Sequence, residues 1–157
     1  MVVVEVNGYK IEPGADLAGA DLAEAYLVRA DLTRADLTGA DLEQANLTRA
    51  DLTGADLTGA DLTDADLTRA DLTYTKFTRA YIDRANLTGA YLDRTYLGDL
   101  GLLGMELSRT YLTAANLRGA NLIEANLEVV DFSQATADET TQWPEGSDPE
   151  VGGVVFE

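Results

Sequence analysis

Residues 30–49 read ADLTRADLTGADLEQANLTR, and this stretch decides the fold. The same five-residue pattern runs in one frame from Ala15 to Gln134, which makes 24 consecutive units without an insertion or deletion. Leu stands at the centre of nearly every unit, and only Phe77, Ile82 and Phe132 replace it. Ala usually stands two places before the centre, Asp or Asn comes directly before it in 16 of the 24 units, and Thr often follows it.

A period of five fits neither an amphipathic helix, which repeats near 3.6 residues, nor an alternating strand, which repeats every two. The Leu and the Ala of each unit must face inward, and the three polar places must face outward. A chain that turns a corner after every unit meets this requirement, and four such units close one square coil. The 24 units then predict six coils, which are 15–34, 35–54, 55–74, 75–94, 95–114 and 115–134.

The units ADLTR at 30–34, ADLTG at 35–39 and ANLTR at 45–49 match the motif A(D/N)LXX of the pentapeptide-repeat family. The chain resembles this family over residues 15–134, and its Leu-centred units are similar to those common in cyanobacterial members. The resemblance implies an all-β fold, namely a right-handed quadrilateral (four-sided) parallel β-helix, a solenoid of about six coils. Side chains four units apart would then stack, as in the expected interior column of Leu17, Leu37, Leu57, Phe77, Leu97 and Leu117.

The two ends of the chain depart from the repeat. Asn7-Gly8 stands between apolar runs, which is the strongest short-range signal for a hairpin, so residues 1–14 are expected to form a hairpin cap. Open coil ends expose unpaired strand edges, and such edges need covering. Residues 135–157 contain the only Trp, Trp143, and are expected to form a C-terminal cap or tail.

The composition favours a binding role over catalysis. The net charge is -17, which argues against direct binding to nucleic acid or to anionic membranes, because both depend on Lys and Arg. The chain has no His and no Cys, and its acidic residues would line a convex surface, so we expect no enzyme activity, no cofactor and no metal centre. It has neither an apolar run long enough to span a membrane nor the features of a secretory signal in its first residues, so a cytoplasmic location is expected.

The acidic residues concentrate in the first three predicted coils. Residues 15–74 carry 13 acidic and 4 basic side chains, a net charge of -9, whereas residues 75–134 carry 7 and 6, a net charge of -1. Stacking predicts three acidic columns, namely Asp16, Asp36 and Asp56; Asp21, Asp41 and Asp61; and Asp31, Asp51 and Asp71. We expect each carboxylate to accept a turn N–H, and the columns also suit a surface that imitates nucleic acid or a ladder bridged by cations.

Aromatic and basic residues supply a second candidate surface. Exposed aromatics beside Arg are typical of interface centres. The expected partner-binding residues are Tyr74, Tyr91, Arg94, Tyr96, Leu103 and Tyr111, with Tyr91 and Tyr111 stacked on one face and a bulge or small loop within 96–109. A separate column of Arg29, Arg49 and Arg69, with Arg109 farther along, is expected to pair with neighbouring aspartates.

These features predict a non-enzymatic scaffold or protein-interaction module that is a monomer or a dimer. The alternative is a DNA-mimicking modulator of a type II topoisomerase (gyrase), which acts through its acidic faces, as the resemblance to quinolone-resistance members implies. Two departures weaken this alternative. Those members favour Phe at the centre of the unit, and residues 135–157 have no obvious match to their dimerising helix.

Overall fold

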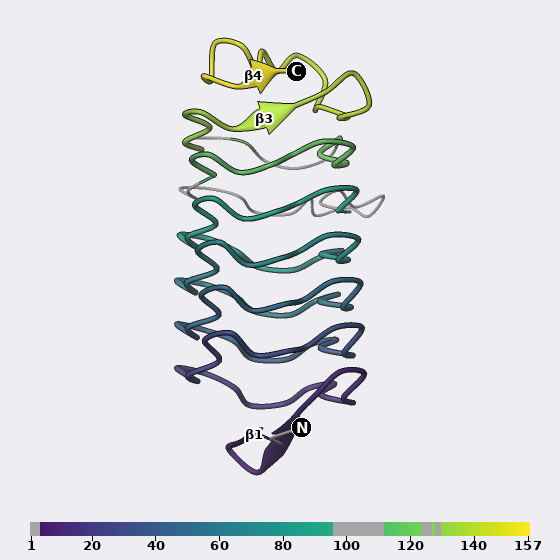
Figure 1. Ribbon diagram of the computed structural model, residues 1–157, viewed down its shortest axis with the longest axis vertical. Coiled ribbons are helices and arrows are strands. Elements are labelled where there is room, and N and C mark those ends of the chain that lie inside the picture. Colours follow the sequence, from purple (N-terminus) through teal and green to yellow (C-terminus); the bar gives the residue numbers. More distant parts are fainter. Residues whose placement is uncertain (1–3, 96–111, 124–126, 128–129) are drawn as a thin grey trace.

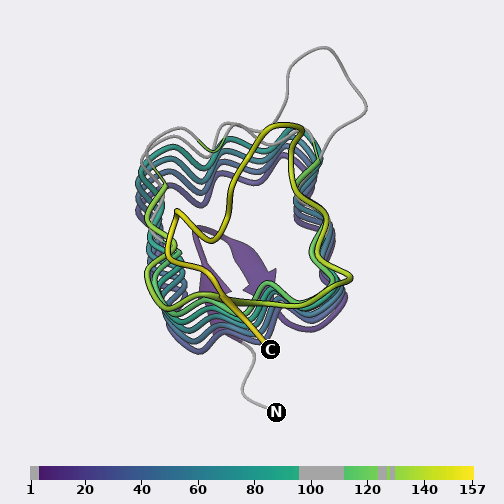
Figure 2. The same ribbon diagram turned by 90° about the horizontal axis from the view of Figure 1, so that it is seen from above.

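The polypeptide winds into a right-handed, four-sided parallel β-helix, as the sequence predicts. The computed structural model describes residues 4–95, 112–123, 127 and 130–157. The coils stack along one long axis with the two termini at opposite ends (Figure 1). Seen along this axis, successive coils superpose on a nearly square outline (Figure 2). The molecule is therefore a four-sided prism, and each five-residue unit forms one side of one coil.

Each corner of the coil is a tight turn that follows the centre of a unit. The N–H of Ala20 donates to the carbonyl of Leu17 at 3.0 Å, and Gly19 between them has a φ of 64°. A positive φ at the third residue of a four-residue turn is the mark of a type II turn. Arg49 holds the same left-handed conformation, with a φ of 60°. The fifth place of the unit therefore projects its side chain outward from a corner, which suits Gly and long polar residues.

Leu and Ala side chains fill the interior. The central residues from Leu22 to Leu92 are at most 2% exposed, and the Ala residues from Ala35 to Ala90 are equally buried. Thr75 and Thr95 take the place of Ala, and their buried hydroxyls donate to the carbonyls of Leu52 at 2.8 Å and Leu72 at 2.7 Å. The interior is thus apolar, and these two polar substitutions satisfy their own hydrogen bonds.

Backbone hydrogen bonds join each coil to the next. The N–H of Leu17 donates to the carbonyl of Asp36 at 2.7 Å, and the N–H of Asp36 donates to the carbonyl of Ala15 at 2.9 Å. Parallel bridges of this kind link corresponding places in units four apart, from Asp16–Asp36 to Asp71–Tyr91. They define four faces, which we number by the units of the first coil and continue in steps of four units. The first face starts at 15–19, the second at 20–24, the third at 25–29 and the fourth at 30–34.

The stacking register advances by one whole unit between Tyr91 and Asn116. Tyr91 forms a bridge with Asn116, which lies five units farther along the chain rather than four, and the N–H of Gly89 donates to Thr113 with the same offset. Five units rather than four therefore separate these positions along the chain, so the expected uniform register with coils at 95–114 and 115–134 is wrong. Leu117 consequently stands above Leu92 on the fourth face, and not above Leu97 as the uniform spacing predicts. The predicted bulge within 96–109 lies outside the described residues.

The N-terminal end carries the predicted hairpin. Strand β1 (Val4–Val6) pairs antiparallel with β2 (Tyr9–Ile11), and Asn7 and Gly8 form the turn with φ values of 51° and 84°. Ile11 is buried against the core, and Val6 and Tyr9 pack beside it. The hairpin lies across the end of the square outline in Figure 2.

At the C-terminal end the coil path continues past Gln134, where the sequence pattern stops. Thr136 bridges to Asn116, and Ala135 and Ala137 are fully buried. Strand β3 (Thr136–Ala137) pairs in parallel with β4 (Val155–Phe156), which lies beyond it at the C-terminal end of the prism (Figure 1). The Trp143 ring packs edge-on against Phe132, with 5.7 Å between ring centroids. Residues 135–157 therefore add apolar contacts to the end of the core.

Candidate interaction surfaces

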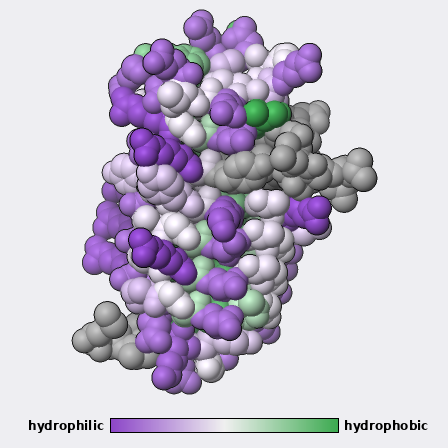
Figure 3. All heavy atoms as spheres, turned by 90° about the vertical axis from the view of Figure 1, so that its right-hand side faces the viewer, coloured by the Kyte–Doolittle hydropathy of each residue, from purple (hydrophilic) through white to green (hydrophobic). Residues whose placement is uncertain are grey.

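The aspartates of the first three coils form three columns, as their spacing of four units predicts. Parallel bridges connect the members of each column in sequence: Asp16, Asp36 and Asp56; Asp21, Asp41 and Asp61; Asp31, Asp51 and Asp71. Neighbouring coils are about 4.8 Å apart, so the carboxylates of a column repel one another. Figure 3 shows one side of the prism, where hydrophilic side chains recur from coil to coil and hydrophobic residues appear only as small patches.

A local hydrogen bond holds each of these carboxylates. The N–H of Thr53 donates to Asp51 Oδ1 at 3.0 Å, and the N–H of Thr63 donates to Asp61 Oδ1 at 2.9 Å. The other seven aspartates of the columns accept the N–H of the second following residue in the same way. Asn46 uses its side-chain oxygen identically. The expected turn hydrogen bonds are thus confirmed, and they require an oxygen at this place but no charge.

Several carboxylates outside these columns are stabilised in their ionised form. The hydroxyl and then the N–H of Ser133 donate to Asp131, which lowers the pKa of this carboxyl below its usual value. The hydroxyl of Thr140 lowers the pKa of Asp138 in the same manner. Hydrogen bonds from Arg84, followed by its charge, lower the pKa of Asp64. These groups therefore remain negative at neutral pH.

A tyrosine and an arginine stack on the edge of the fourth face. The guanidinium of Arg94 lies 5.6 Å from the ring centroid of Tyr74, one coil below, and donates a hydrogen bond to its hydroxyl. Tyr91 lies on the same unit as Arg94, above Asp71. Tyr74 and Tyr91 are 52% and 53% exposed. We call Tyr74, Tyr91 and Arg94 the tyrosine surface.

The structure places only part of the predicted partner-binding set in this surface. Tyr96, Leu103 and Tyr111 lie outside the described residues. The expected stacking of Tyr91 on Tyr111 is wrong, because Asn116 occupies the position above Tyr91. The cause is the shift of one unit in register. Each later unit lies one face earlier than the uniform spacing predicts.

The arginine column on the third face differs from its prediction. Arg29, Arg49 and Arg69 take part in none of the ion pairs or side-chain hydrogen bonds found among the described residues, so the expected pairing with aspartates is wrong. By contrast, Arg84 pairs with Asp64 and Asp83, and Lys76 pairs with Asp56 at 3.1 Å. The pairs Lys76–Asp56 and Arg84–Asp64 join the same place of two stacked units, whereas each arginine of this column stacks on Arg or Gly. The place before the centre on the third face also holds only one acid, Asp66.

The arginine column lines a shallow, open groove of about 590 Å³. Tyr26 and Val28 lie at its N-terminal end, and Thr48, Thr68 and Thr88 line it along the axis. The sequence analysis did not identify this groove. The scarcity of Asp on the third face could have predicted it, and this scarcity is visible in the sequence once the units are sorted by face.

The described part of the chain also bears on metal binding and membrane insertion. Within it, no group of three or more acidic side chains is placed to hold a metal ion. No helix that could span a membrane occurs in these residues.

Comparisons with known proteins agree with this architecture. The family profile described as pentapeptide repeats matches residues 14–49, 45–82, 60–99 and 106–141. No curated protein is significantly similar in sequence to the chain.

Among solved structures, the chain is similar to HetL of the cyanobacterium Nostoc sp. strain PCC 7120, a pentapeptide repeat protein involved in the regulation of heterocyst differentiation. The two are 35% identical with a TM-score of 0.75, and the match covers 92% of this chain and 60% of HetL. The chain thus spans three-fifths of the length of HetL.

Two further structures share the fold. The pentapeptide repeat protein alr5209, also from Nostoc, is 28% identical with a TM-score of 0.54, and the match covers 81% of this chain and 84% of alr5209. QnrB1, a plasmid-mediated fluoroquinolone resistance protein, is 19% identical with a TM-score of 0.55 over 93% of this chain and 77% of its own, which indicates a common fold alone. The repeat, the square coil and the profile match together assign this chain to the pentapeptide-repeat family.

Proposed function

We propose that the chain is a non-enzymatic protein-interaction module that contacts its partner through the tyrosine surface. The observation that carries this proposal is the exposed stack of Tyr74 and Arg94 beside Tyr91 on a rigid face. Tyr and Arg dominate the energetic centres of protein interfaces, and Tyr buries a large area at low entropic cost. The stack holds Arg94 in place before a partner arrives, which reduces the ordering cost of binding.

A pull-down from extracts of the source organism tests this proposal. The double variant Tyr74→Ala/Tyr91→Ala is expected to lose the partner that the unchanged protein retains. Tyr81→Ala is the matched control, because Tyr81 is 56% exposed, occupies the same place in its unit as Tyr91 and lies on the second face above Asp61. If both variants retain the partner equally, the tyrosine surface is not the contact.

A second candidate is a DNA-mimicking modulator of gyrase, and the three aspartate columns favour it. Each column places one negative charge on every coil along the rod, much as a nucleic-acid backbone carries regularly spaced phosphates. In this role the acidic faces would occupy the DNA-binding surface of the enzyme.

A gyrase supercoiling assay separates the two candidates. DNA mimicry requires inhibition at low micromolar protein and loss of inhibition when Asp31, Asp51 and Asp71 are all changed to Asn. The amide oxygen of Asn preserves the turn hydrogen bond, as Asn46 does for Thr48 at 3.1 Å, so the variant changes charge and leaves the fold intact. Supercoiling that proceeds unchanged at high micromolar protein would reject DNA mimicry and leave the tyrosine surface as the working candidate.

A further inference from the structure

One face of this acidic protein is positively charged. Between residues 15 and 94, the third face consists of units 25–29, 45–49, 65–69 and 85–89, which contain three arginines and a single acid, Asp66. Its net charge is therefore +2. The matching units carry a net charge of -1 on the first face, -6 on the second and -2 on the fourth. A basic strip thus runs along the axis between two acidic faces.

The arginines of this strip are free to bind a ligand. The guanidinium groups of Arg29, Arg49 and Arg69 have no hydrogen-bond or ion-pair partner among the described residues, in contrast with Arg84, Arg94 and Arg118. Three stacked guanidinium groups without an ion-pair partner repel one another when their coils are about 4.8 Å apart. An anion that lies along the column would relieve this repulsion and satisfy the unused donors.

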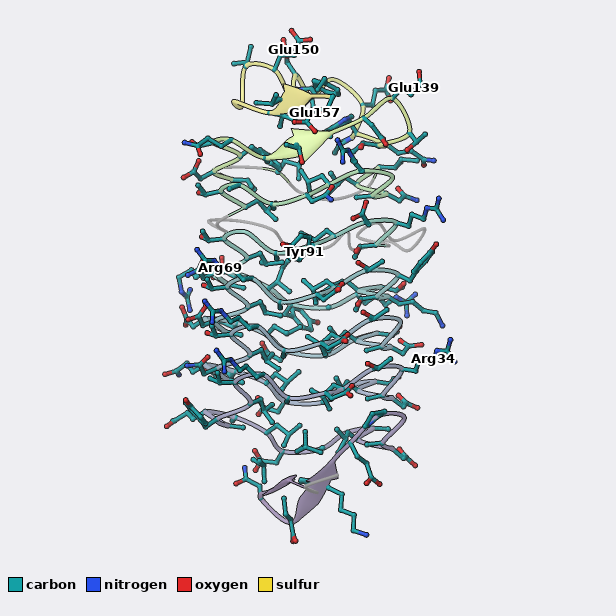
Figure 4. All side chains as sticks on the ribbon, in the orientation of Figure 1. Arg34, Arg69, Tyr91, Glu139, Glu150 and Glu157 are labelled. Carbon is teal, nitrogen blue, oxygen red and sulfur yellow. The ribbon has the colours of Figure 1, made fainter. Side chains whose placement is uncertain are left out.

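The groove gives such an anion a defined path. Tyr26, which is 73% exposed, stands at its N-terminal end, and Thr88 marks the other end. At Gly89, where this column has no side chain, an added Cβ would lie 3.3 Å from Arg69 Cγ, so Arg69 leans along the axis over the next coil. In Figure 4, Arg69 and Arg34 lie at opposite edges of the prism, and Tyr91 lies between them.

We propose that this groove binds an extended acidic segment of a partner protein, with its carboxylates on the arginine column and its N-terminal or C-terminal flank on Tyr26. The fork of donors on Arg matches a carboxylate. The groove spans three coil rises, or about 14 Å, and its arginine column two, or about 10 Å. An extended peptide of five residues covers about 13 Å, with alternate side chains about 7 Å apart, so the long Arg side chains must lean along the axis to meet its carboxylates. The occupant is a short segment, because a duplex is wide enough to bring its phosphates against the acidic second and fourth faces.

Fluorescence anisotropy with a labelled peptide of sequence Glu-Ser-Glu-Ser-Glu tests the proposal at about 0.15 M salt, where the Debye length of about 8 Å limits the influence of distant charges. The unchanged protein is expected to bind the peptide, and Arg49→Gly to weaken binding at least about fivefold. Arg34→Gly is the matched control. Arg34 has the same place in its unit and a φ of 57°, compared with 60° for Arg49, but it lies on another edge.

Glycine suits both positions, since each requires a left-handed φ, so both variants keep the fold and lose one positive charge. A loss confined to Arg49→Gly supports the groove as the site. Equal losses in the two variants, or no binding at the highest protein concentration of about 1 mM, would overturn the proposal. Tighter binding of a short DNA duplex than of the peptide would also overturn it and assign the groove to nucleic acid. None of these outcomes depends on the tyrosine surface, so this proposal and the proposed function fail separately.

Discussion

At the scale of single residues, the fifth place of the unit sets the shape of the molecule. It combines a left-handed φ with an outward side chain, and it holds Gly at some corners, such as Gly19, and long polar residues at others, such as Arg49. A residue with a Cβ is strained there by roughly 1 kcal/mol. The chain has non-glycine residues at most of its described corners. These residues lower the stability of the fold, and their side chains project outward from the corners.

We expect Gly39→Ala to lower the free energy of unfolding by about 1 kcal/mol. Gly39 has a φ of 64°, and no atom lies within 4 Å of an added Cβ, so the effect isolates backbone strain from steric clash. Urea unfolding measures it, and Ala114→Gly at a φ of 56° is the reverse control, which should gain stability. An unchanged midpoint for Gly39→Ala would show that the corner conformation carries no strain.

The hydrogen bonds to Asp131 predict a pH dependence. Its pKa is lower in the folded protein than in the unfolded chain, so the ionised carboxylate contributes stability that is complete above about pH 4 and is lost as the pH falls through the folded pKa. Asp131→Asn keeps the acceptor oxygen without the proton equilibrium. The difference in melting temperature between the unchanged protein and Asp131→Asn should therefore shrink from pH 6 to pH 2. A constant difference over this range would contradict the lowered pKa.

At the scale of the coil, each unit contributes little on its own and depends on the coils above and below. The central Leu residues supply most of the buried apolar area, and the bridges give each unit one pairing partner on either side. Stability in such a solenoid arises from contacts between neighbours.

Leu67→Ala should therefore destabilise the protein by about 2–5 kcal/mol, because it opens a cavity in a fully buried column. Ile123→Ala is the control, since Ile123 is 47% exposed, and should change stability by less than about 0.5 kcal/mol. Chemical denaturation measures both. A loss below about 1 kcal/mol for Leu67→Ala would mean that the neighbouring coils close over the missing side chain.

The coil was predictable from sequence, and its exceptions were not. The inward places are fixed by Leu and Ala, so the square coil and the aspartate columns follow from the period, and the resemblance to the family implied the right-handed β-helix. The advance in register between Tyr91 and Asn116 could not be seen, because the addition of one whole unit leaves the pattern in phase. The continuation into Ala135 and Ala137 was hidden for another reason, since Ala stands there at a centre that elsewhere holds Leu.

At the scale of the whole molecule, the distribution of charge over the faces matters more than the total of -17. The total correctly describes an acidic rod, but it conceals a basic third face. The groove escaped prediction because the arginines were expected to find aspartate partners, whereas Arg29, Arg49 and Arg69 have none among the described residues.

The stacked aspartates predict that salt stabilises this protein. Raising NaCl from about 10 mM to about 0.5 M shortens the Debye length from about 30 Å to about 4 Å and screens the repulsion within each column. The melting temperature should rise by a few degrees, and the rise should be smaller in the triple Asp31, Asp51 and Asp71 to Asn variant. A fall with added salt would show that ion pairs such as Arg84–Asp64 outweigh the repulsion.

The one-unit advance also bears on how such molecules can change over time. A unit gained or lost between two coils leaves the five-residue pattern on either side in phase, so Leu92 before it and Leu117 after it both stay buried. It nevertheless carries all later units a quarter turn around the axis and aligns each with a different set of neighbours. In this chain it puts Asn116 above Tyr91. In this architecture, the gain or loss of a whole unit can therefore bring different outward side chains together on a face, while the buried Leu positions on either side stay the same.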